Sequence, residues 1–235
     1  MKETLESNYQ ALWSKHKDSN FNDLLVRGFA YHYDEDEQGS DILYVGINPS
    51  FDEGSEVPSI IGTEFQSFPF DRTASHSYFD PFRKIKEELE AECYLLKSLK
   101  WTHIDVLVFR ETNQKYINTL LNHGQGIPFV YEQVMIARER IIHIQPKVIV
   151  VSNTKAKELM GKNRFKPENK DEEVGVWMDF QFEFDMEYGS HRITNVPELA
   201  HTHVFFSSML SGQRALDLGS RERLVWQIGR VLLKQ

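Results

Sequence analysis

Four short, continuously apolar segments alternate along this chain with stretches of helical spacing. They are residues 42–45, 104–109, 148–151 and 204–206. Strands that are buried on both faces show such uninterrupted apolar runs, and parallel sheets bury both faces beneath helices. The pattern therefore predicts an α/β fold, in which a three-layer αβα sandwich surrounds a four-stranded, mostly parallel sheet.

Helices are predicted between and around these strands. Phe21–Phe29 is interpreted as a second helix or a docking segment, and Ser152-Asn153-Thr154 is expected to cap a helix after the third strand. Apolar residues recur with helical spacing in four further segments, which are Thr4–His16, Tyr78–Leu99, Glu132–Ile144 and Arg221–Leu233.

Two segments interrupt this alternation. Residues 176–196 alternate apolar and polar side chains, which predicts a β-hairpin inserted between the third and fourth strands, with an antiparallel extension of the sheet as one arrangement left open. Residues 51–77 have little periodicity, and such a long loop within a domain is often functional. No repeat or low-complexity linker divides the chain, so we expect residues 1–235 to form one domain with residues 1–40 as an N-terminal helical extension.

Composition restricts the class of protein. The chain has 235 residues, a formal net charge of −8 and one cysteine, Cys93. A lone cysteine excludes an internal disulfide, a cysteine-ligated iron–sulfur cluster and a four-cysteine zinc site, and it fits a reducing cytosol. No apolar run reaches the length of a membrane span and no signal-peptide pattern is present, so we expect a cytoplasmic protein. The acidic charge opposes binding to nucleic acid.

Polar residues follow each predicted strand at its carboxyl end, where open α/β sheets bind ligands. In the first of these loops, Gly46 permits an unusual backbone conformation, Pro49 stiffens the exit, and Asn48 presents a short amide between them. Asn-Pro pairs also begin ordinary turns, so this stretch alone leaves a plain turn equally open. The four loops expected to gather are Gly46–Ser50, Phe109–Asn113, Val151–Thr154 and Ser207–Arg214.

Short motifs occur along the chain from Asp41 onward. GINPS follows the first strand at Gly46–Ser50, FPF is followed by SYFDPFRKI, Gln145-Pro146 leads into KVIVVSNTKA, and the last strand opens VFFSSMLSGQRAL. In this order the motifs resemble the uracil-DNA glycosylase superfamily, and most of all its mismatch-specific uracil/thymine branch, whose first motif reads G-I-N-P-G. The resemblance extends from Asp41 to the C-terminus.

The resemblance implies a monofunctional DNA N-glycosylase of base excision repair, a hydrolase that flips uracil or a related deaminated base out of the helix. Asn48 would be catalytic and would hold the water that attacks the sugar C1′, although its amide cannot take up a proton. The base would be bound by Gly46, Ile47, Phe68, Phe70, Arg110 and Asn113. Met209 or Leu210 would be the apolar wedge among the DNA contacts, which are Ser50, Asn153, Ser208, Met209, Leu210, Ser211, Gly212 and Arg214.

The resemblance also implies a monomer without cofactor or metal that acts on single-stranded or mismatched duplex DNA. Ser50 stands where the branch has Gly, the second motif lacks the histidine of several branches, and Asn113 is displaced from the position where some branches read uracil. Two alternatives remain open. One is a non-catalytic nucleic-acid or nucleotide-binding protein of the same fold, and the other is a hydrolase of free nucleosides, which the acidic charge suits better.

Three other patterns indicate chemistry less specifically. His201 and His203 would place two imidazoles on one strand face as a zinc pair, but no further ligand is suitably spaced. The serines of residues 207–211 lack the G-x-S-x-G setting of a nucleophile. The basic side chains of residues 162–170 fit a solvated loop better than a phosphate site.

Overall fold

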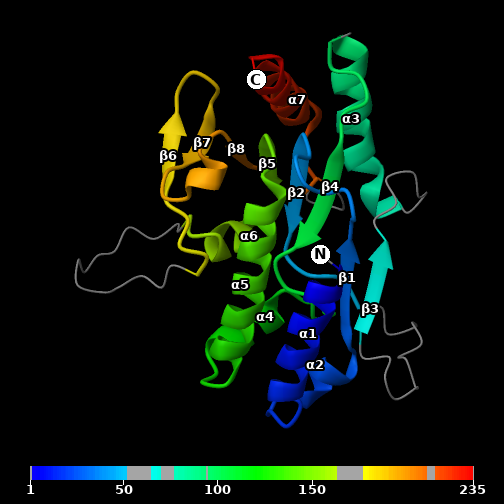
Figure 1. Ribbon diagram of the computed structural model, residues 1–235, viewed down its shortest axis with the longest axis vertical. Coiled ribbons are helices and arrows are strands. Elements are labelled where there is room, and N and C mark those ends of the chain that lie inside the picture. The colour runs from blue at the N-terminus through cyan, green and yellow to red at the C-terminus, as the bar shows by residue number, and fades with distance from the viewer. Residues whose placement is uncertain are drawn as a thin grey trace. The chain divides into compact units, whose positions relative to one another are not determined.

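The structure is α/β, with the helices and strands labelled in Figure 1. These elements are divided between two units. The computed structural model describes residues 2–51, 65–69, 77–93, 95–162, 177–210 and 215–234, with only the backbone of residues 22, 65–69 and 77. Unit 1 is made of Met1–Asp36, Ile47–Phe70 and Ile104–Arg140. Unit 2 is made of Glu37–Gly46, Asp71–His103 and Ile141–Gln235.

Unit 2 is built on a six-stranded sheet in the order β4-β2-β5-β8-β7-β6. Its strands β2 (Ile42–Gly46), β5 (Val148–Val151) and β8 (His203–Phe206) are parallel. Val45 lies opposite Val151, which lies opposite Phe206, so the carboxyl ends of the three strands are aligned at one edge. β4 (Trp101–Asp105) lies beside β2 at the outside of the sheet.

Helices cover both faces of this sheet. α3 (Asp80–Glu92) and α7 (Leu218–Lys234) contact each other, and Phe82 of α3 packs on Tyr44 of β2 with 4.6 Å between ring centroids. Because side chains alternate along a strand, Val45, Val151 and Phe206 point to the opposite face from Tyr44. There α6 (Thr154–Leu159) places the Lys157 ammonium 5.8 Å from the centroid of the Phe206 ring.

Several predicted elements of unit 2 are confirmed. Every residue of β2 and β5 is buried, as their apolar runs predict. α6 begins at the predicted cap, because Asn153 Oδ1 accepts hydrogen bonds from Lys155 N at 2.8 Å and Ala156 N at 3.2 Å. The helix predicted at the end of the chain forms as α7 and buries Leu224, Ile228, Val231 and Leu232.

The predicted hairpin forms from β6 (Phe182–Asp185) and β7 (Ser190–Ile193), which pair antiparallel. Its turn needs a glycine at Gly189, which has a φ of +63° and donates its N–H to Asp185 O at 2.9 Å. A Cβ at this position would also lie 2.4 Å from Gln227 Nε2. Substitution of Gly189 would therefore strain the backbone and displace the Gln227 side chain.

The prediction of a four-stranded, mostly parallel sheet is not confirmed, because the sheet has six strands and is mixed. β7 pairs antiparallel with β8, so the hairpin extends the same sheet. This pairing satisfies the backbone N–H and C=O groups of β8 that would otherwise form an open edge. The α/β class itself agrees with the prediction.

Unit 1 has an aromatic core beside a small sheet. β1 (Phe29–Tyr33) and β3 (Phe65–Pro69) pair in parallel as two strands. Around the ring of Phe129 lie Phe21, Phe29 and Phe109, at centroid distances of 4.8, 6.1 and 5.9 Å. The helices of this unit are α1 (Lys2–His16), α2 (Asn22–Val26), α4 (Lys115–Leu121) and α5 (Gly126–Ile144), of which α5 continues into unit 2 after Arg140.

Residues 1–40 were predicted to be a helical extension. The segment also contains the strand β1, so it is not purely helical. α1 forms where its periodicity predicts and buries Leu5, Tyr9 and Leu12. β1 depends on pairing with β3, which lies more than thirty residues further on, so no local pattern marks it. Two acidic side chains that follow β1, Asp34 and Glu37, are buried.

The second apolar strand is displaced from the predicted residues 104–109 to Trp101–Asp105. The polar side chains of Thr102 and His103 conceal its first half in the sequence, although both are buried. The apolar residues that follow form hydrogen bonds outside the large sheet. Val108 N donates to Oε1 of the buried Gln133 at 2.9 Å, and Val108 O accepts from Ala30 N at 2.9 Å.

The remaining differences concern the ends of helices. The helix predicted over Tyr78–Leu99 consists of the 3₁₀ turn η1 (Ser77–Phe79) followed by α3, which ends at Glu92. A second 3₁₀ turn, η2 (Pro197–Leu199), precedes β8. Within the described residues, no helix combines the length and the apolar character required to cross a membrane. The single-domain organisation stays a prediction.

Candidate functional site

Two of the four predicted loops are hydrogen bonded to each other in unit 1. Glu111 N donates to Pro49 O at 3.0 Å. Thr112 adds a second connection, since Phe51 N donates to its Oγ1 at 3.1 Å and the same hydroxyl donates to Phe51 O at 2.5 Å. The loop that follows β2 and the loop that follows Phe109 therefore lie side by side, as expected from the sequence.

The Asn48 amide is held in one orientation by this pair of loops. Its Nδ2 donates to Glu111 O at 2.6 Å and to Pro49 O at 2.9 Å. Both partners are carbonyl oxygens, so only the NH₂ side of the amide can face them. Among the described residues Oδ1 has no hydrogen-bond partner, and the side chain is only half-buried. Asn48 therefore presents an oriented hydrogen-bond acceptor.

Glu111 anchors the loop that orients Asn48. Its carboxylate accepts from Arg27 Nη1 at 2.5 Å and from Asn113 N at 2.7 Å. Only 10% of the Glu111 side chain is exposed, so the ion pair with Arg27 is largely shielded from water. Asn113, predicted to bind the base, uses Oδ1 to accept from Lys115 N at 3.0 Å at the start of α4.

A second guanidinium nearby has no carboxylate partner within the described residues. Phe51 is flanked by two cations, with Arg27 Cζ 4.8 Å and Arg110 Cζ 5.2 Å from its ring centroid. Arg27 is paired with Glu111, whereas Arg110 has no hydrogen bond or ion pair with any described residue. Burial lowers the pKa of Arg110, but a guanidinium remains charged at neutral pH. Arg110 is thus positioned to meet an anion.

Arg27→Met is expected to lower the free energy of unfolding by about 1–3 kcal/mol, because it leaves a largely buried carboxylate without its cation. Urea denaturation followed by circular dichroism measures this loss. Arg27→Lys should restore part of the stability, since it restores the charge without the guanidinium geometry. Equal midpoints for wild type and Arg27→Met would show that the ion pair contributes nothing.

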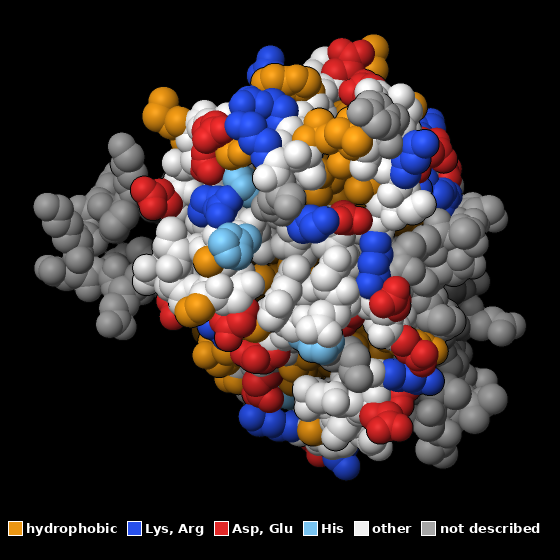
Figure 2. Space-filling model, turned by 45° about the horizontal axis from the view of Figure 1, so that its top comes forward, with side chains coloured by type: hydrophobic (Ala, Val, Ile, Leu, Met, Phe, Trp, Pro, Cys, Tyr) orange, Lys and Arg blue, Asp and Glu red, His pale blue; other side chains and the backbone are white. Residues whose placement is uncertain are grey.

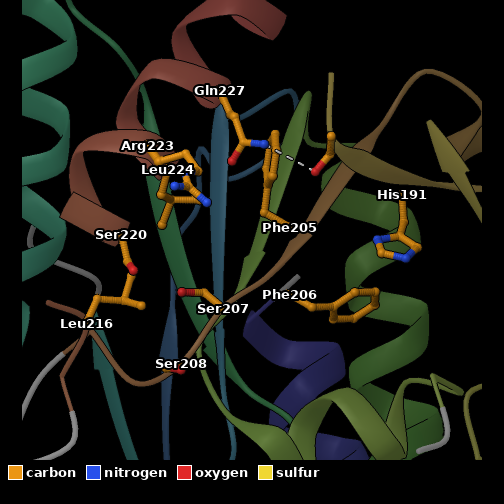
Figure 3. Close-up of a pocket in the computed structure, with 11 residues that line it drawn as sticks. His191, Phe205, Phe206, Ser207, Ser208, Leu216, Ser220, Arg223, Leu224 and Gln227 are labelled. Carbon is orange, nitrogen blue, oxygen red and sulfur yellow. Dashed lines mark hydrogen bonds between the residues drawn. The ribbon is translucent and has the colours of Figure 1, made fainter. Parts of the chain in front are cut away.

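The other two predicted loops belong to unit 2 and follow β5 and β8. Ser152 N donates to Val45 O at 3.1 Å and Ser207 N donates to Val151 O at 2.9 Å, so the ladder continues one residue beyond each strand. A pocket of about 290 Å³ opens where β8 ends. Figure 3 shows it between the β7–β8 side and the first turns of α7; its lining includes His191, Phe206, Ser207, Ser208, Ser220 and Arg223.

The predicted DNA contacts have different surroundings. Leu210 is 7% exposed and Met209 is 36% exposed, so Met209 is the wedge candidate that already reaches solvent. Asn153 is buried and its Oδ1 caps α6. Ser50 and Ser208 are exposed. The remaining three predicted contacts, Ser211, Gly212 and Arg214, lie outside the described residues.

The predicted base-binding residues are only partly described. Gly46 ends β2 and Ile47 is buried directly after it. The backbone of Phe68 lies in β3 opposite His32, while its side chain and all of Phe70 lie outside the described part of the chain. Stacking of either ring on a base therefore stays a prediction.

Asp105 is a titratable group that the sequence analysis did not single out. It ends β4, and burial raises the pKa of its carboxyl to about 7, against an opposing effect of Arg140. The sequence offered one indication of this group, because Asp105 is a carboxylate within the apolar run IDVLVF.

The Asp105 carboxyl is expected to make stability depend on pH. Its pKa rises from 3.8 to about 7 on folding, so the folded protein binds an extra proton between about pH 4 and 7. This contribution is therefore fully present below pH 4 and is lost as the pH rises to 7. Relative to Asp105→Asn, the wild type should lose up to about 1.4 kcal/mol per pH unit in urea unfolding. Parallel pH profiles of the two proteins would contradict the assignment.

The two histidines considered as a zinc pair do not share a strand. His201 lies in a turn before β8. His203 lies in β8, where its Nδ1 is 2.8 Å from Ser190 Oγ and its Nε2 contacts Arg192. In the part of the chain that the structure describes, no group of three or more His, Cys, Asp or Glu side chains is arranged to hold a metal ion.

Charges of both signs are mixed on the surface. Figure 2 shows Lys and Arg side chains interspersed with Asp and Glu across the face that it presents, and the described side chains there form no continuous basic area. Together with the net charge of −8, this pattern favours weak, salt-sensitive binding to any nucleic acid.

Comparison with known proteins identifies no family. No protein-family model matches the chain, and no curated protein matches it in sequence. The resemblance to the uracil-DNA glycosylase superfamily therefore rests on motifs within the chain's own sequence.

Proposed function

We propose that this chain is a DNA glycosylase that hydrolyses the N-glycosidic bond of uracil or a related deaminated base. The observation that supports this most directly is the orientation of the Asn48 amide. Two carbonyl oxygens occupy its NH₂ group, which leaves Oδ1 to accept a hydrogen bond from a water molecule. Asn48 would then aim that water at the sugar C1′.

The chemistry of this bond suits a site without a strong base. As the bond breaks, positive charge develops on the sugar and negative charge on the departing base, so the protein contributes mainly position and electrostatic stabilisation. An amide can hold the water even though it cannot remove its proton. Arg110, which is unpaired among the described residues and half-buried, would face the developing negative charge of the base.

The proposal extends to the finer fold and to the setting of the reaction. Parallel β2, β5 and β8 between α3 and α7 on one face and α6 on the other are compatible with a three-layer sandwich of the uracil-DNA glycosylase type. We expect a cytoplasmic monomer that acts in base excision repair, on single strands or mismatched duplexes in which the base is easily flipped. Because of the acidic charge, binding should be strongest at low salt.

Single-turnover cleavage tests this function. Protein in excess is incubated at low salt with end-labelled oligonucleotides that contain uracil, hypoxanthine or xanthine, each in single strands and in mismatched duplexes, and hot alkali then reveals abasic sites. Undamaged strands of the same sequence are the control. Strand breaks only at the modified base would support a glycosylase, whereas an unbroken strand with every substrate would exclude it.

Hydrolysis of free nucleosides is the second candidate, and the net charge of −8 favours it because a neutral nucleoside is not repelled. Uridine and deoxyuridine are incubated with the same preparation and the released base is measured by liquid chromatography. Release from the nucleosides without cleavage of the oligonucleotides would select this reaction over DNA repair.

A further inference from the structure

The pocket at the end of β8 contains several hydrogen-bond donors that have no partner among the described residues. The hydroxyls of Ser207 and Ser208 and the guanidinium of Arg223 form no side-chain hydrogen bond or ion pair with any described residue. Figure 3 shows Ser220 and Arg223 on the α7 side of the pocket, with the Ser207 hydroxyl turned toward them. Three groups that can donate hydrogen bonds to a ligand thus lie around one cavity.

The charge of this pocket favours an anion. Arg223 is the only charged side chain among its described lining residues, and no described Asp or Glu lines it. The carboxylate of Asp217, just before α7, already accepts hydrogen bonds from the backbone N and the hydroxyl of Ser220. A guanidinium beside free hydroxyls matches the oxygens of a phosphate, which accept hydrogen bonds and do not donate them when ionised.

Two aromatic rings at the β7–β8 end of the pocket lie on the face of the sheet that α6 covers, whereas Arg223 lies on the face that α7 covers. His191 and Phe206 lie 5.1 Å apart between ring centroids, and Lys157 lies over the Phe206 ring. Burial, with the nearby charges of Lys162 and Lys157, lowers the pKa of His191 to about 4, so this ring is neutral at pH 7. These rings point away from Arg223, so the groups of the pocket that can bind a ligand together are Arg223, Ser207 and Ser208.

We propose that this pocket binds a phosphate group carried by a nucleotide or by a nucleic-acid backbone, with Arg223, Ser207 and Ser208 as its donors. The volume of about 290 Å³ lies near the lower limit of roughly 300 Å³ for small-molecule sites, which suits one phosphate with its sugar. The position agrees with the general rule that open α/β sheets bind ligands beyond the carboxyl ends of their strands. Binding here does not require base excision.

Binding to the full chain tests the proposal with three probes: inorganic phosphate, thymidine 5′-monophosphate and fluorescein-labelled (dT)15. None contains uracil, so the result is independent of glycosylase activity. Calorimetry serves for the first two probes and fluorescence anisotropy for the third. Arg223→Gln should weaken whichever probe binds by about 10- to 100-fold, and Ser207→Ala by about 2- to 10-fold. For (dT)15, Arg223→Gln should also reduce the slope of log affinity against log salt by about 0.7.

Arg230→Gln is the matched control. It removes the same charge from the same helix at a residue that contacts Trp226 and Tyr188 and is not part of the pocket lining. It should change affinity less than twofold. Arg223 is exposed, so its replacement should leave the urea midpoint unchanged and a binding loss cannot be attributed to unfolding.

The three probes separate the two sources of phosphate. Arg223-dependent binding of inorganic phosphate or the monophosphate would identify a nucleotide site, and Arg223-dependent binding of (dT)15 alone would identify a backbone site; either result supports the pocket. Equal losses in Arg223→Gln and Arg230→Gln, or no binding of any probe, would overturn it. Failure of the oligonucleotide cleavage assay would leave this outcome unaffected.

Discussion

Asn48→Ala is expected to reduce the single-turnover rate of base release by about 10²- to 10⁴-fold. The truncation removes Oδ1, which is the only hydrogen-bond acceptor of the side chain and has no partner among the described residues. The attacking water would lose its orientation, while DNA binding elsewhere would be retained. Quenched-flow or manual sampling of alkali-sensitive sites, with protein in excess over the oligonucleotide, measures the rate.

Asn48→Asp tests whether the orientation of the side chain at position 48 matters more than the presence of a polar group there. A carboxylate at this position would face Glu111 O and Pro49 O, with which the amide now forms hydrogen bonds of 2.6 and 2.9 Å. Repulsion between oxygens should therefore turn the side chain and also abolish most activity, despite the presence of a stronger base. Asn118→Ala, the same truncation as Asn48→Ala but at an exposed position of α4, is the control and should act at the wild-type rate. Full activity of Asn48→Ala would remove this residue from the mechanism.

Phe82→Ala is expected to lower the free energy of unfolding by about 3–5 kcal/mol. Phe82 is 1% exposed and joins α3 to the sheet through Tyr44 and Trp101, whose rings lie 4.6 and 6.3 Å away between centroids. Truncation would leave a cavity at the contact between helix and sheet, where no water could replace the lost packing. Urea denaturation measures the difference, as the free energies of unfolding of wild type and variant are compared with the same dependence on urea concentration.

Phe184→Ala is the matched control for this effect. It makes the same truncation in the same unit, but Phe184 is 55% exposed on β6. The truncation should lower the free energy of unfolding by less than about 1 kcal/mol, because only a small part of the Phe184 side chain is buried in the folded protein. Similar losses in the two variants would show that α3 is not part of the stabilising core of unit 2.

The elements predicted most accurately are those whose burial is complete and local. β2 and β5 are buried at every residue, so continuous apolar runs were sufficient to place them. α7 buries one stripe of side chains, and its helical period was equally clear. The α6 cap was predictable because Asn153 satisfies backbone N–H groups only two and three residues away.

The elements that were missed depend on distant partners. β1 acquires its strand conformation from β3, and β4 includes the buried polar residues Thr102 and His103, which no apolar pattern would select. The hairpin was predicted with an antiparallel extension of the sheet left open, and the pairing of β7 with β8 decided that it belongs to the main sheet. Local composition cannot specify such pairings, because strand propensity depends on what lies beside the strand.

The candidate site shows the same division. The sequence alone placed Asn48 at the end of a buried strand and brought its loop and the loop at Arg110–Asn113 to one region by topology. Only the tertiary structure decided which atom of Asn48 is left to act, because the carbonyl oxygens of Pro49 and Glu111 take its NH₂ group and leave Oδ1. It likewise decided that Arg27 pairs with Glu111 and leaves Arg110 without a carboxylate among the described residues. The reason is physical: residue type fixes which hydrogen bonds a side chain can form, and only the folded neighbours determine which of them remain open.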